Sequence, residues 1–440
     1  MSGLIMAAQL ILGLSILVTL HELGHYLAAR AFGIRVEKFY LFFDAWGFKF
    51  FNFKKGDTEY GIGWLPLGGY VKISGMIDES MDKEAMKQSP QPWEFRSKPA
   101  WQRLVVMVAG VAMNVFLGII IYTMSLLNYD KEYLSNADIP DGIYAFDLGK
   151  EVGLQNNDHI TSIDGKPVIR FEDLLSSRVL FGSDLLVDRN GKSLEVVIPD
   201  NFYRSIIKSG RGNFIGPYRA NLRIDSVFAG FPGEAAGFKK KDHILRLNGE
   251  RIFSSEKFKK MIGENKNKPV TIQVLRGMDT IMIQPVVNDS GLIGIINYPD
   301  FGNYTLTPYT FSEAISFGSS DAFEAITMNL KGLKQIFAGK EKASDSLQGP
   351  IGIATIYGGI WDWHRFWNIT GLLSMILAFM NILPIPALDG GHVFFLLIES
   401  VTRRKFSDKF MERAQVAGMI ILLSLMVFTV GNDIWKHILN

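Results

Sequence analysis

Long apolar stretches alternate with mixed polar segments along this chain. Four of them approach or reach the ~20 residues that a helix needs to cross a ~30 Å hydrocarbon core; they lie at 3–29, 104–127, 369–388 and 414–430. The alternative is that these stretches are buried helices of a large soluble protein, but the lengths of the stretches favour membrane spans. The pattern predicts a polytopic α-helical membrane protein with four transmembrane helices, in the segments 1–31, 101–127, 368–388 and 411–432.

The first apolar stretch could also be a secretory signal. Its apolar run is longer than the usual core of such a signal, and no Lys or Arg precedes it. We therefore expect it to be retained as a membrane span.

Basic side chains indicate how the spans are oriented. Lys and Arg collect after the first span, before the second and before the fourth. Loops of this kind beside a span stay on the cytosolic side. We predict cytosolic segments at 32–100 and 389–410, an external segment between the second and third spans, and both termini outside, including the tail 433–440.

The external segment contains an internal repeat. A pattern of Gly, Asp and a second Gly at 153–165 recurs 84 residues later at 237–249. In each copy an alternating apolar run ends in Asp-Gly or Asn-Gly, which is the signal for a strand that closes into a tight hairpin. Helical stretches follow at 171–180 and 255–262, and a further strand follows at 270–275.

The order of strand, turn, helix and strand resembles the PDZ domain in its circularly permuted bacterial form. We therefore predict two tandem extracytoplasmic PDZ-like α/β domains, at 128–212 and 213–300. Neither copy contains a carboxylate-binding loop of the Gly-Leu-Gly-Phe type. A steric or structural role for the pair is at least as well supported as peptide binding.

Helical periodicity reappears after the repeat. Apolar residues between 311 and 337 recur at a near-helical spacing, within an external region that we place at 301–367. The spacing predicts an amphipathic helix, with an interruption at Gly318 as one option. This helix could lie on the outer membrane surface or pack on the second repeat.

Composition narrows the chemistry. The net charge is only +2, so bulk electrostatics give no reason to expect a nucleic-acid partner. The chain has no cysteine, which excludes disulfides, thiolate metal sites and a cysteine nucleophile. Any bound metal must therefore use His, Asp or Glu.

Ionisable residues interrupt the first apolar stretch at 21–25, where the sequence reads His-Glu-Leu-Gly-His and fits the His-Glu-x-x-His pattern. On a helix His21 and His25 lie about 40° apart around the axis and ~6 Å apart along it, close enough to bind one metal ion. Glu22 lies beside them, where it could take a proton from a metal-bound water. Ionisable groups in an apolar span each cost a few kcal/mol, and metal coordination would offset that cost.

A catalytic zinc site takes three protein ligands and leaves one position open for water. Asp389 is the only acid in or at the end of the third apolar stretch. Counted from the outer ends of their spans, His21 and Asp389 lie at ~27 and ~30 Å of helical rise, near the cytosolic leaflet. Pro384 and Pro386 must break the helix before Asp389. His392 is a rival ligand, to which we assign a supporting role, and an ordinary turn at the membrane boundary is the alternative for Asp389.

Three short motifs together resemble one known family. They are the His-Glu-x-x-His run at 21–25, a Gly-x-x-x-Asn run at 110–114 and an Asn-x-x-Pro-x-Pro-x-Leu-Asp-Gly run at 381–390. The combination is similar to the site-2 protease family of intramembrane zinc metalloproteases. Two PDZ-like domains between the second and third of four spans are similar to its bacterial members, and the resemblance covers essentially the whole chain.

The resemblance implies a cofactor, a mechanism and partners. One Zn²⁺ per chain would be bound by His21, His25 and Asp389, with Glu22 as the general base. The family cuts single-span membrane proteins in or near the lipid bilayer, often anti-sigma factors already trimmed outside, and also remnant signal peptides. An external regulator acting on the PDZ-like domains is a further expected partner, and the expected location is the bacterial inner membrane.

Substrate contacts are expected from two places. By the resemblance, Asn381 and Asn114 lie near the scissile peptide, although membrane Asn residues more commonly hydrogen-bond between helices. Glycine-broken strands at 60–74, in a membrane-associated β-hairpin region, could pair with an extended substrate. A plain membrane-dipping hairpin that shields the site is the alternative. The substrate-binding residues of this hairpin would be Gly68, Gly69 and Tyr70.

Two other functions remain open at this stage. One is a different membrane-anchored zinc peptidase for membrane protein quality control, with its metal site completed by a Glu on a soluble cytosolic helix. The other is a non-enzymatic receptor or scaffold that uses its PDZ-like domains. The first would tolerate loss of Asp389, and the second would tolerate loss of Glu22.

Overall fold

The computed structural model describes residues 2–66, 68–76, 89–209, 213–218, 221–252, 255–300, 304–339, 342, 344 and 347–436. Residues 77–88 of the predicted cytosolic segment, and 437–440 of the predicted tail, lie outside this part of the chain. The chain divides into two compact units. One is formed by Met1–Lys131 with Tyr309–Asn440, and the other by Glu132–Pro308.

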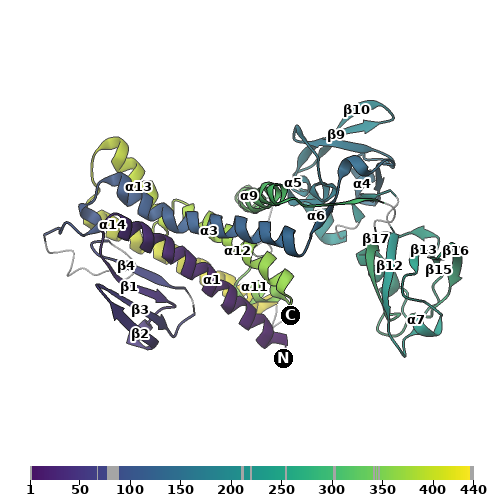
Figure 1. Cartoon of the computed structure of the whole chain (residues 1–440), viewed down its shortest axis with the longest axis horizontal. Coiled ribbons are helices and arrows are strands. Elements are labelled where there is room, and N and C mark those ends of the chain that lie inside the picture. The colour runs from purple at the N-terminus through teal and green to yellow at the C-terminus, as the bar shows by residue number, and fades with distance from the viewer. Residues whose placement is uncertain are drawn as a thin grey trace. The chain divides into compact units, whose positions relative to one another are not determined.

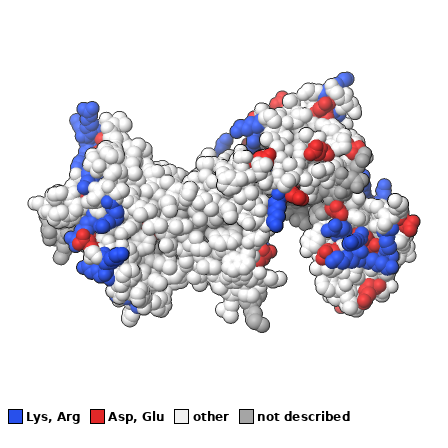
Figure 2. Space-filling model, in the orientation of Figure 1, with Lys and Arg blue, Asp and Glu red and all other residues white. Residues whose placement is uncertain are grey.

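Four helices of the first unit are long and apolar enough to cross a membrane (Figure 1). They are α1 (Ser2–Ala31), α3 (Ala100–Asn128), α12 (Trp363–Ile382) and α14 (Asp408–Ile434). Each overlaps one predicted apolar stretch, so the prediction of a multi-pass membrane protein is confirmed. The face of these helices seen in Figure 2 shows few charged side chains, as lipid contact requires.

The third span differs from its prediction at both ends. It begins at Trp363 rather than at residue 368, and it ends at Ile382 rather than at residue 388. Pro384 and Pro386 follow directly and prevent the helix from continuing. A separate helix, α13 (Asp389–Thr402), then begins within the segment predicted as a loop at 389–410.

Helix α9 (Phe311–Phe337) matches the predicted amphipathic helix and runs through Gly318 without a break. Its small buried residues, among them Ala314, Gly318 and Ala322, allow it to pack closely against α3 and α12. A Cβ at Gly318 would lie 2.7 Å from the backbone nitrogen of Thr123 on α3. Within the first unit, α9 therefore has α3 and α12 as its packing partners. A short helix that the sequence analysis missed, α11 (Pro350–Tyr357), follows α9 in the chain.

A four-stranded sheet stands where a hairpin was predicted. Its strands are β1 (Val36–Leu41), β2 (Lys49–Lys55), β3 (Thr58–Gly63) and β4 (Tyr70–Ile73), in the order β2-β3-β1-β4. β3 runs parallel to β1, and β4 runs antiparallel to β1 on its other side. A hairpin is present in this region, between the antiparallel strands β2 and β3. The strands at 60–74 do not form a hairpin with each other, because the chain between β3 and β4 crosses the end of β1, where Phe43 pairs with Leu65. Two single 3₁₀ turns, η1 (Ala45–Gly47) and η2 (Phe95–Ser97), complete this region.

An apolar core fixes this sheet to the long helices. Val36 and Ile73 of the sheet pack with Ala29 at the end of α1 and with Val106 and Met107 of α3. All five side chains are at most 3% exposed. The edge strand β4 is therefore held at a fixed position beside α1.

The second unit contains two β-rich domains, each with its own hydrophobic core. The elements of the first domain are β5 (Glu132–Leu134), η3 (Asn136–Asp138), β6 (Ile143–Ala145), α4 (Asp147–Glu151), β7 (His159–Ile163), β8 (Lys166–Pro167), η4 (Phe171–Leu175), α5 (Ser177–Leu180), β9 (Ser183–Arg189), β10 (Lys192–Ile198), α6 (Phe202–Ser209) and β11 (Ile215–Pro217). Those of the second are β12 (Asn221–Val227), α7 (Pro232–Ala235), β13 (His243–Leu247), β14 (Glu250–Arg251), α8 (Ser255–Gly263), β15 (Ile272–Arg276), β16 (Asp279–Ile283) and β17 (Ile295–Asp300). A last strand, β18 (Leu306–Pro308), follows the second domain.

The sheets of the two domains share one arrangement around the repeated strand. The first has the order β10-β9-β7-β8, with a separate β11-β6 pair, and the second has the order β16-β15-β13-β12-β17, with β14 on β13. The predicted tight turns are confirmed, because residues 164–165 and 248–249 have positive φ and close the β7–β8 and β13–β14 hairpins. β5 pairs with β18, so the chain enters and leaves this unit side by side.

The sequence repeat also encodes a buried ion pair. Asp158 is fully buried and accepts two hydrogen bonds from Arg189, which also donates to the carbonyl of Gly153. The same three-part contact recurs in the second domain, between Asp242, Arg276 and the carbonyl of Gly237. The sequence analysis found the Gly and the Asp but missed the Arg, which lies on the third strand of each repeat.

We expect Asp242→Ala to destabilise the second β domain by about 2–3 kcal/mol, because it leaves the Arg276 guanidinium without its buried partner. Hydrogen exchange of β13 and β15 in the full chain measures the effect. Asp279→Ala, at an exposed position of the same domain, should change stability by less than about 0.5 kcal/mol. Equal exchange rates in the two variants would contradict the role of the pair.

Candidate metal centre and its pocket

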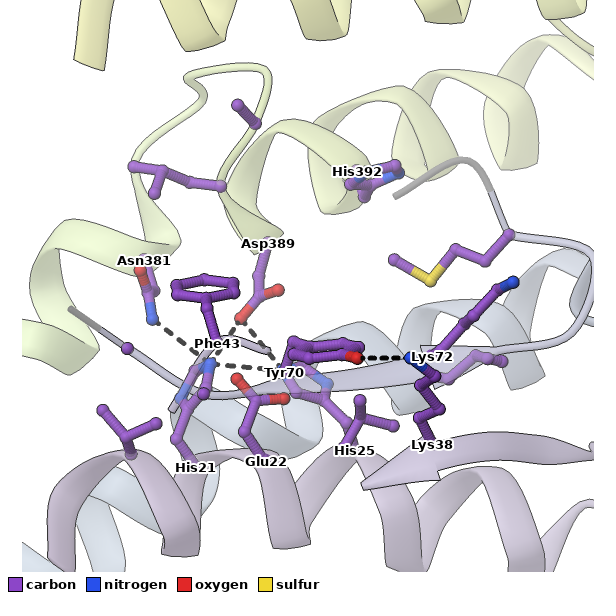
Figure 3. A pocket seen from close by; sticks show the side chains of 18 of the residues that line it. His21, Glu22, His25, Lys38, Phe43, Tyr70, Lys72, Asn381, Asp389 and His392 are labelled. Carbon is purple, nitrogen blue, oxygen red and sulfur yellow. Dashed lines mark hydrogen bonds and ion pairs between the residues drawn. The ribbon is translucent and has the colours of Figure 1, made fainter. Parts of the chain in front are cut away.

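A pocket in the first unit brings together the sequence motifs (Figure 3). Its walls come from α1, β4, α14 and the segment around the start of α13. Apolar side chains line most of it, including Val18, Phe43 and Met107. The polar and charged lining residues are His21, Glu22, His25, Lys38, Asp44, Tyr70, Lys72, Asn381, Asp389, His392 and Gln415.

Three side chains converge on one point of this pocket. His21 and His25 project from one face of α1, and Asp389 is the first residue of α13. The two Nε2 atoms are 3.2 Å apart, and Asp389 Oδ2 lies 3.1 Å from that of His21 and 3.2 Å from that of His25. Figure 3 shows the three side chains pointing toward one another. Among the described residues, they form a group that could hold a metal ion.

This triangle of atoms fits a metal ion better than it fits direct hydrogen bonds. The carbonyl oxygen of Val106 lies 2.8 Å from His25 Nδ1; since it can only accept, Nδ1 of the neutral ring carries the proton and Nε2 presents a lone pair. Asp389 Oδ2 is buried without a hydrogen bond to any described residue. Lone pairs that face one another repel unless a cation lies among them. Ligand atoms around tetrahedral zinc lie roughly 3.3 Å apart, so the three residues fit zinc.

Two asparagines contact His21 from different sides. Asn114 Nδ2 lies 3.1 Å from His21 Nδ1, and Asn381 Nδ2 lies 3.3 Å from His21 Nε2. Asn114 is fully buried behind the ring and is not among the residues that line the pocket, whereas Asn381 lines it. The structure thus places the Asn381 amide at the pocket and the Asn114 amide behind the His21 ring.

Glycines make room for the two histidines. A Cβ at Gly110 on α3 would lie 2.3 Å from Nε2 of His25 and 2.8 Å from Cε1 of His21. Gly24, between the two histidines, faces the Ala109 carbonyl, and a Cβ there would lie 2.4 Å from that oxygen. α1 and α3 can therefore approach closely enough for the imidazoles to fill the gap between them.

Asp389 is positioned by the tight segment before it. Gly390 and Gly391 pack against the backbone of residues 382–386, where an added Cβ would lie within 2.3–2.6 Å of carbonyl oxygens. Gly418 of α14 contacts the Pro386 carbonyl even more closely. The two glycines after Asp389 are thus required by packing, and the sequence analysis did not identify Gly418.

A buried ion pair holds α13 against α3. Arg103 Nη2 lies 2.5 Å from Glu399 Oε1, and both side chains are at most 12% exposed. The pair joins the helix that begins with Asp389 to the helix that carries Gly110 and Asn114. The sequence analysis counted Arg103 only as a marker of orientation, although a charge just inside an apolar span signals a partner.

Glu22 and His392 complete the polar lining. Figure 3 shows the Glu22 carboxylate pointing into the pocket from between the two histidines on α1. His392 lies one turn beyond Asp389 on α13 and apart from the three converging side chains. It is absent from the described group that could hold a metal ion, so Asp389 rather than His392 is the candidate for the third ligand.

The predicted substrate-binding segment lies along the same pocket. Gly68, Gly69 and Tyr70 line it, and so do the remaining residues of β4 at 71–73. A Cβ at Gly69 would lie 2.6 Å from the Tyr40 carbonyl and 2.8 Å from Val18 of α1. Glycine is therefore required where the chain passes between the sheet and the first span.

Tyr70 belongs to a hydrogen-bonded cluster at the mouth of the pocket. Its hydroxyl donates to Asp44 and accepts from Lys38, which also pairs with Asp44 at 2.8 Å. Burial opposes ionisation of Asp44, but the bonds from Lys38 and Tyr70 lower the pKa of its carboxyl below the usual range. Burial, followed by the bond to Asp44, raises the pKa of the Tyr70 hydroxyl. Tyr70 therefore stays neutral and fixed, and its ring stacks on Phe43.

We expect Gly110→Ala to abolish metal binding, because its methyl group would occupy the space of the His25 imidazole. Zinc content of the purified protein, measured by atomic absorption, tests this. Gly431→Ala on α14 is the matched control, since nothing lies within 4 Å of a Cβ there. A Gly110→Ala protein that retains stoichiometric zinc would contradict the packing described above.

Comparison with known proteins agrees with this site. The profile of Peptidase family M50 matches residues 9–425. Three relatives named "Putative zinc metalloprotease" are similar over almost their whole length. That of Clostridium perfringens is 26% identical, covering 96% of this chain and 97% of the relative; that of Neisseria meningitidis is 26% identical, covering 97% and 98%; and that of Pasteurella multocida is 28% identical, covering 98% and 99%. The chain therefore belongs to peptidase family M50 and is a zinc metalloprotease.

Proposed function

We propose that this protease cleaves single-span membrane proteins within or near the lipid bilayer. The observation that carries the proposal is the convergence of His21, His25 and Asp389 beside Glu22, in a pocket built from the ends of membrane-spanning helices. A site in this position is accessible to a peptide bond that lies in or beside the membrane. One Zn²⁺ per chain is expected, because the described residues provide one such group of ligands.

The residues around the metal have distinct tasks. When bound, zinc provides a Lewis acid that lowers the pKa of water and polarises the scissile carbonyl. Glu22 accepts the proton of the attacking water and delivers it to the leaving amine. Val106 and Asn114 fix the ring orientation of the two histidines, and Asn381 lies where it can donate to the substrate carbonyl.

The substrate is expected to bind as an extended strand. Four consecutive residues of β4, at 70–73, line the pocket. Since neighbouring side chains of a strand point to opposite faces, the pocket must run along the edge of the strand rather than along one face. β4 pairs only with β1 among the described strands, so its other edge can pair with substrate backbone.

The sheet and the basic loops support a cytosolic location for this end of the bundle. In Figure 2, Lys and Arg gather at the end of the first unit that carries the sheet and α13, as the positive-inside rule predicts. On β2 the aromatic residues Phe50, Phe51 and Phe53 are 49–76% exposed, beside Lys54 and Lys55. Aromatic and basic side chains of this kind favour contact with the membrane surface. We propose that the protein lies in a bacterial inner membrane, with the second unit on the extracytoplasmic side.

We assign the two β domains as tandem PDZ-like domains that limit access by size. Each has the repeated strand, hairpin and helix order with its own core. In this function the domains exclude substrates with a bulky external part, so that proteins of the anti-sigma-factor type are cut only after their external part has been trimmed. Remnant signal peptides, which lack such a part, are a second class of substrate. An external regulator could act on the same domains.

The alternative zinc peptidase, with its metal site completed by a cytosolic Glu, is less well supported. Asp389 already lies within 3.2 Å of both histidine ligands. The scaffold alternative is excluded by membership of the peptidase family.

We expect Glu22→Gln to retain zinc but to lower cleavage of a trimmed single-span substrate by about 10²–10⁴-fold, because the proton acceptor is lost. Asp389→Ala should lose both zinc and activity. Gel analysis of the cytosolic fragment and atomic absorption measure the two quantities. Glu195→Gln, at an exposed position on β10, is the control. Full activity of Glu22→Gln, or full zinc content of Asp389→Ala, would refute the mechanism.

We expect replacement of Glu132–Pro308 by a short linker to allow cleavage of an untrimmed substrate that the intact protein refuses. Lys131 and Tyr309 remain joined by a backbone hydrogen bond of 2.9 Å, so the deletion can be bridged without moving the spans. A trimmed substrate should be cut by both forms and serves as the control. Continued refusal of the untrimmed substrate by the shortened, active protein would rule out the size filter.

A further inference from the structure

One pocket residue has no task in the mechanism above. Gln415 of α14 lines the pocket and is only 6% exposed. In the described part of the chain its side-chain amide has no hydrogen-bond partner, and its amide atoms are not among the fully buried unpaired atoms, so the amide is open to the space of the pocket. It lies seven residues into α14, about 10 Å along the helix from its start, within the apolar part of the span.

An amide in this position requires a partner. A buried polar group without a hydrogen bond is unfavourable, and more so in a span that contacts lipid. Membrane Gln residues usually hydrogen-bond to neighbouring helices. Gln9 of α1 follows this rule, since it is fully buried and donates to the carbonyl of Gly358 at 3.0 Å. Gln415 does not, and it lines a cavity instead.

The position of Gln415 indicates what the missing partner is. β4 and α14 both provide walls of the pocket. A substrate strand that pairs with β4 along one edge leaves the N–H and C=O groups of its other edge without partners. A glutamine amide offers one donor group and one acceptor, which matches the N–H and C=O that one extended residue presents on the same edge.

We propose that Gln415 binds the backbone of the substrate strand on the edge opposite β4, as a positioning residue for cleavage. This inference rests on the proposed function and adds a second site of backbone recognition to it. The substrate strand is then held from both sides, by β4 and by α14. A substrate residue without an N–H group, such as proline, would be disfavoured at the position that Gln415 contacts.

Binding of a synthetic peptide to the full-length Glu22→Gln protein in detergent tests this proposal without requiring cleavage. The probe is a fluorescent single-span peptide with about 20 Leu and Ala residues, interrupted by Gly-Ser near its cytosolic end. In this background, Gln415→Met should weaken binding at least about tenfold, because both hydrogen bonds of the amide are lost. Gln9→Met, which replaces a Gln outside the pocket, should leave binding within about twofold. Unchanged zinc content verifies that each variant is folded.

A set of peptides that each carry one N-methylated amide provides the second measurement. With Gln415 present, N-methylation at one position should weaken binding by about tenfold. In the Gln415→Met protein that sensitivity should disappear, while sensitivity to the β4 edge remains. Equal binding by Gln415→Met, with the same sensitive positions, would overturn the proposal. Cleavage by the Glu22 form is measured in parallel, and its absence would refute the proposed proteolysis while the binding comparison still decides the role of Gln415.

Discussion

Three side-chain atoms that could hold a metal ion lie 3.1–3.2 Å apart inside an apolar helical bundle, and the rest of the first unit is arranged around them. Each would be costly at this depth without a cation among them, because lone pairs and charges in a bilayer need partners. The two histidines come from one turn of α1, but the carboxylate comes from a segment more than 360 residues later. The fold must therefore hold that distant carboxylate at a separation set by the size of one ion.

Close backbone contact meets this requirement on both sides. Gly24 and Gly110 bring α1 and α3 together, while Gly390, Gly391 and Gly418 pack the start of α13 against its own preceding segment and against α14. Glycine allows two backbones to come into direct contact. Such a contact fixes the position of the neighbouring ligand side chain more tightly than a contact between rotatable side chains would. The Arg103–Glu399 pair adds a polar contact at the far end of α13. Rigidity here comes from small residues, since lipid provides no hydrophobic force between helices.

The sequence was sufficient for the four apolar spans, the facing pair of histidines on the first span and the hairpin turns, because each depends on a local pattern. Apolar length, the spacing of His21 and His25, and Asp-Gly turns are all visible within a few residues. The four-stranded sheet was not foreseen: the exposed β2 alternates poorly, and the parallel pairing of β1 with β3 depends on a crossover that no local pattern shows. The partners of Asp158, Asp242 and Arg103 were missed for the same reason, since each lies between 31 and 296 residues away. The substrate contacts and the role of the β domains stay predictions.

The pairing of β5 with β18 also has an evolutionary consequence. The chain leaves the first unit at Lys131 and returns to it at Tyr309, and the backbones of these two residues are joined by a hydrogen bond. The bundle therefore constrains only the two ends of the inserted segment between them. Insertions at a closed junction change the entropy of the loop only slowly with length. Modules could thus be gained, lost or exchanged at this point while the helices keep their packing, so the first unit and the second unit can diverge at different rates.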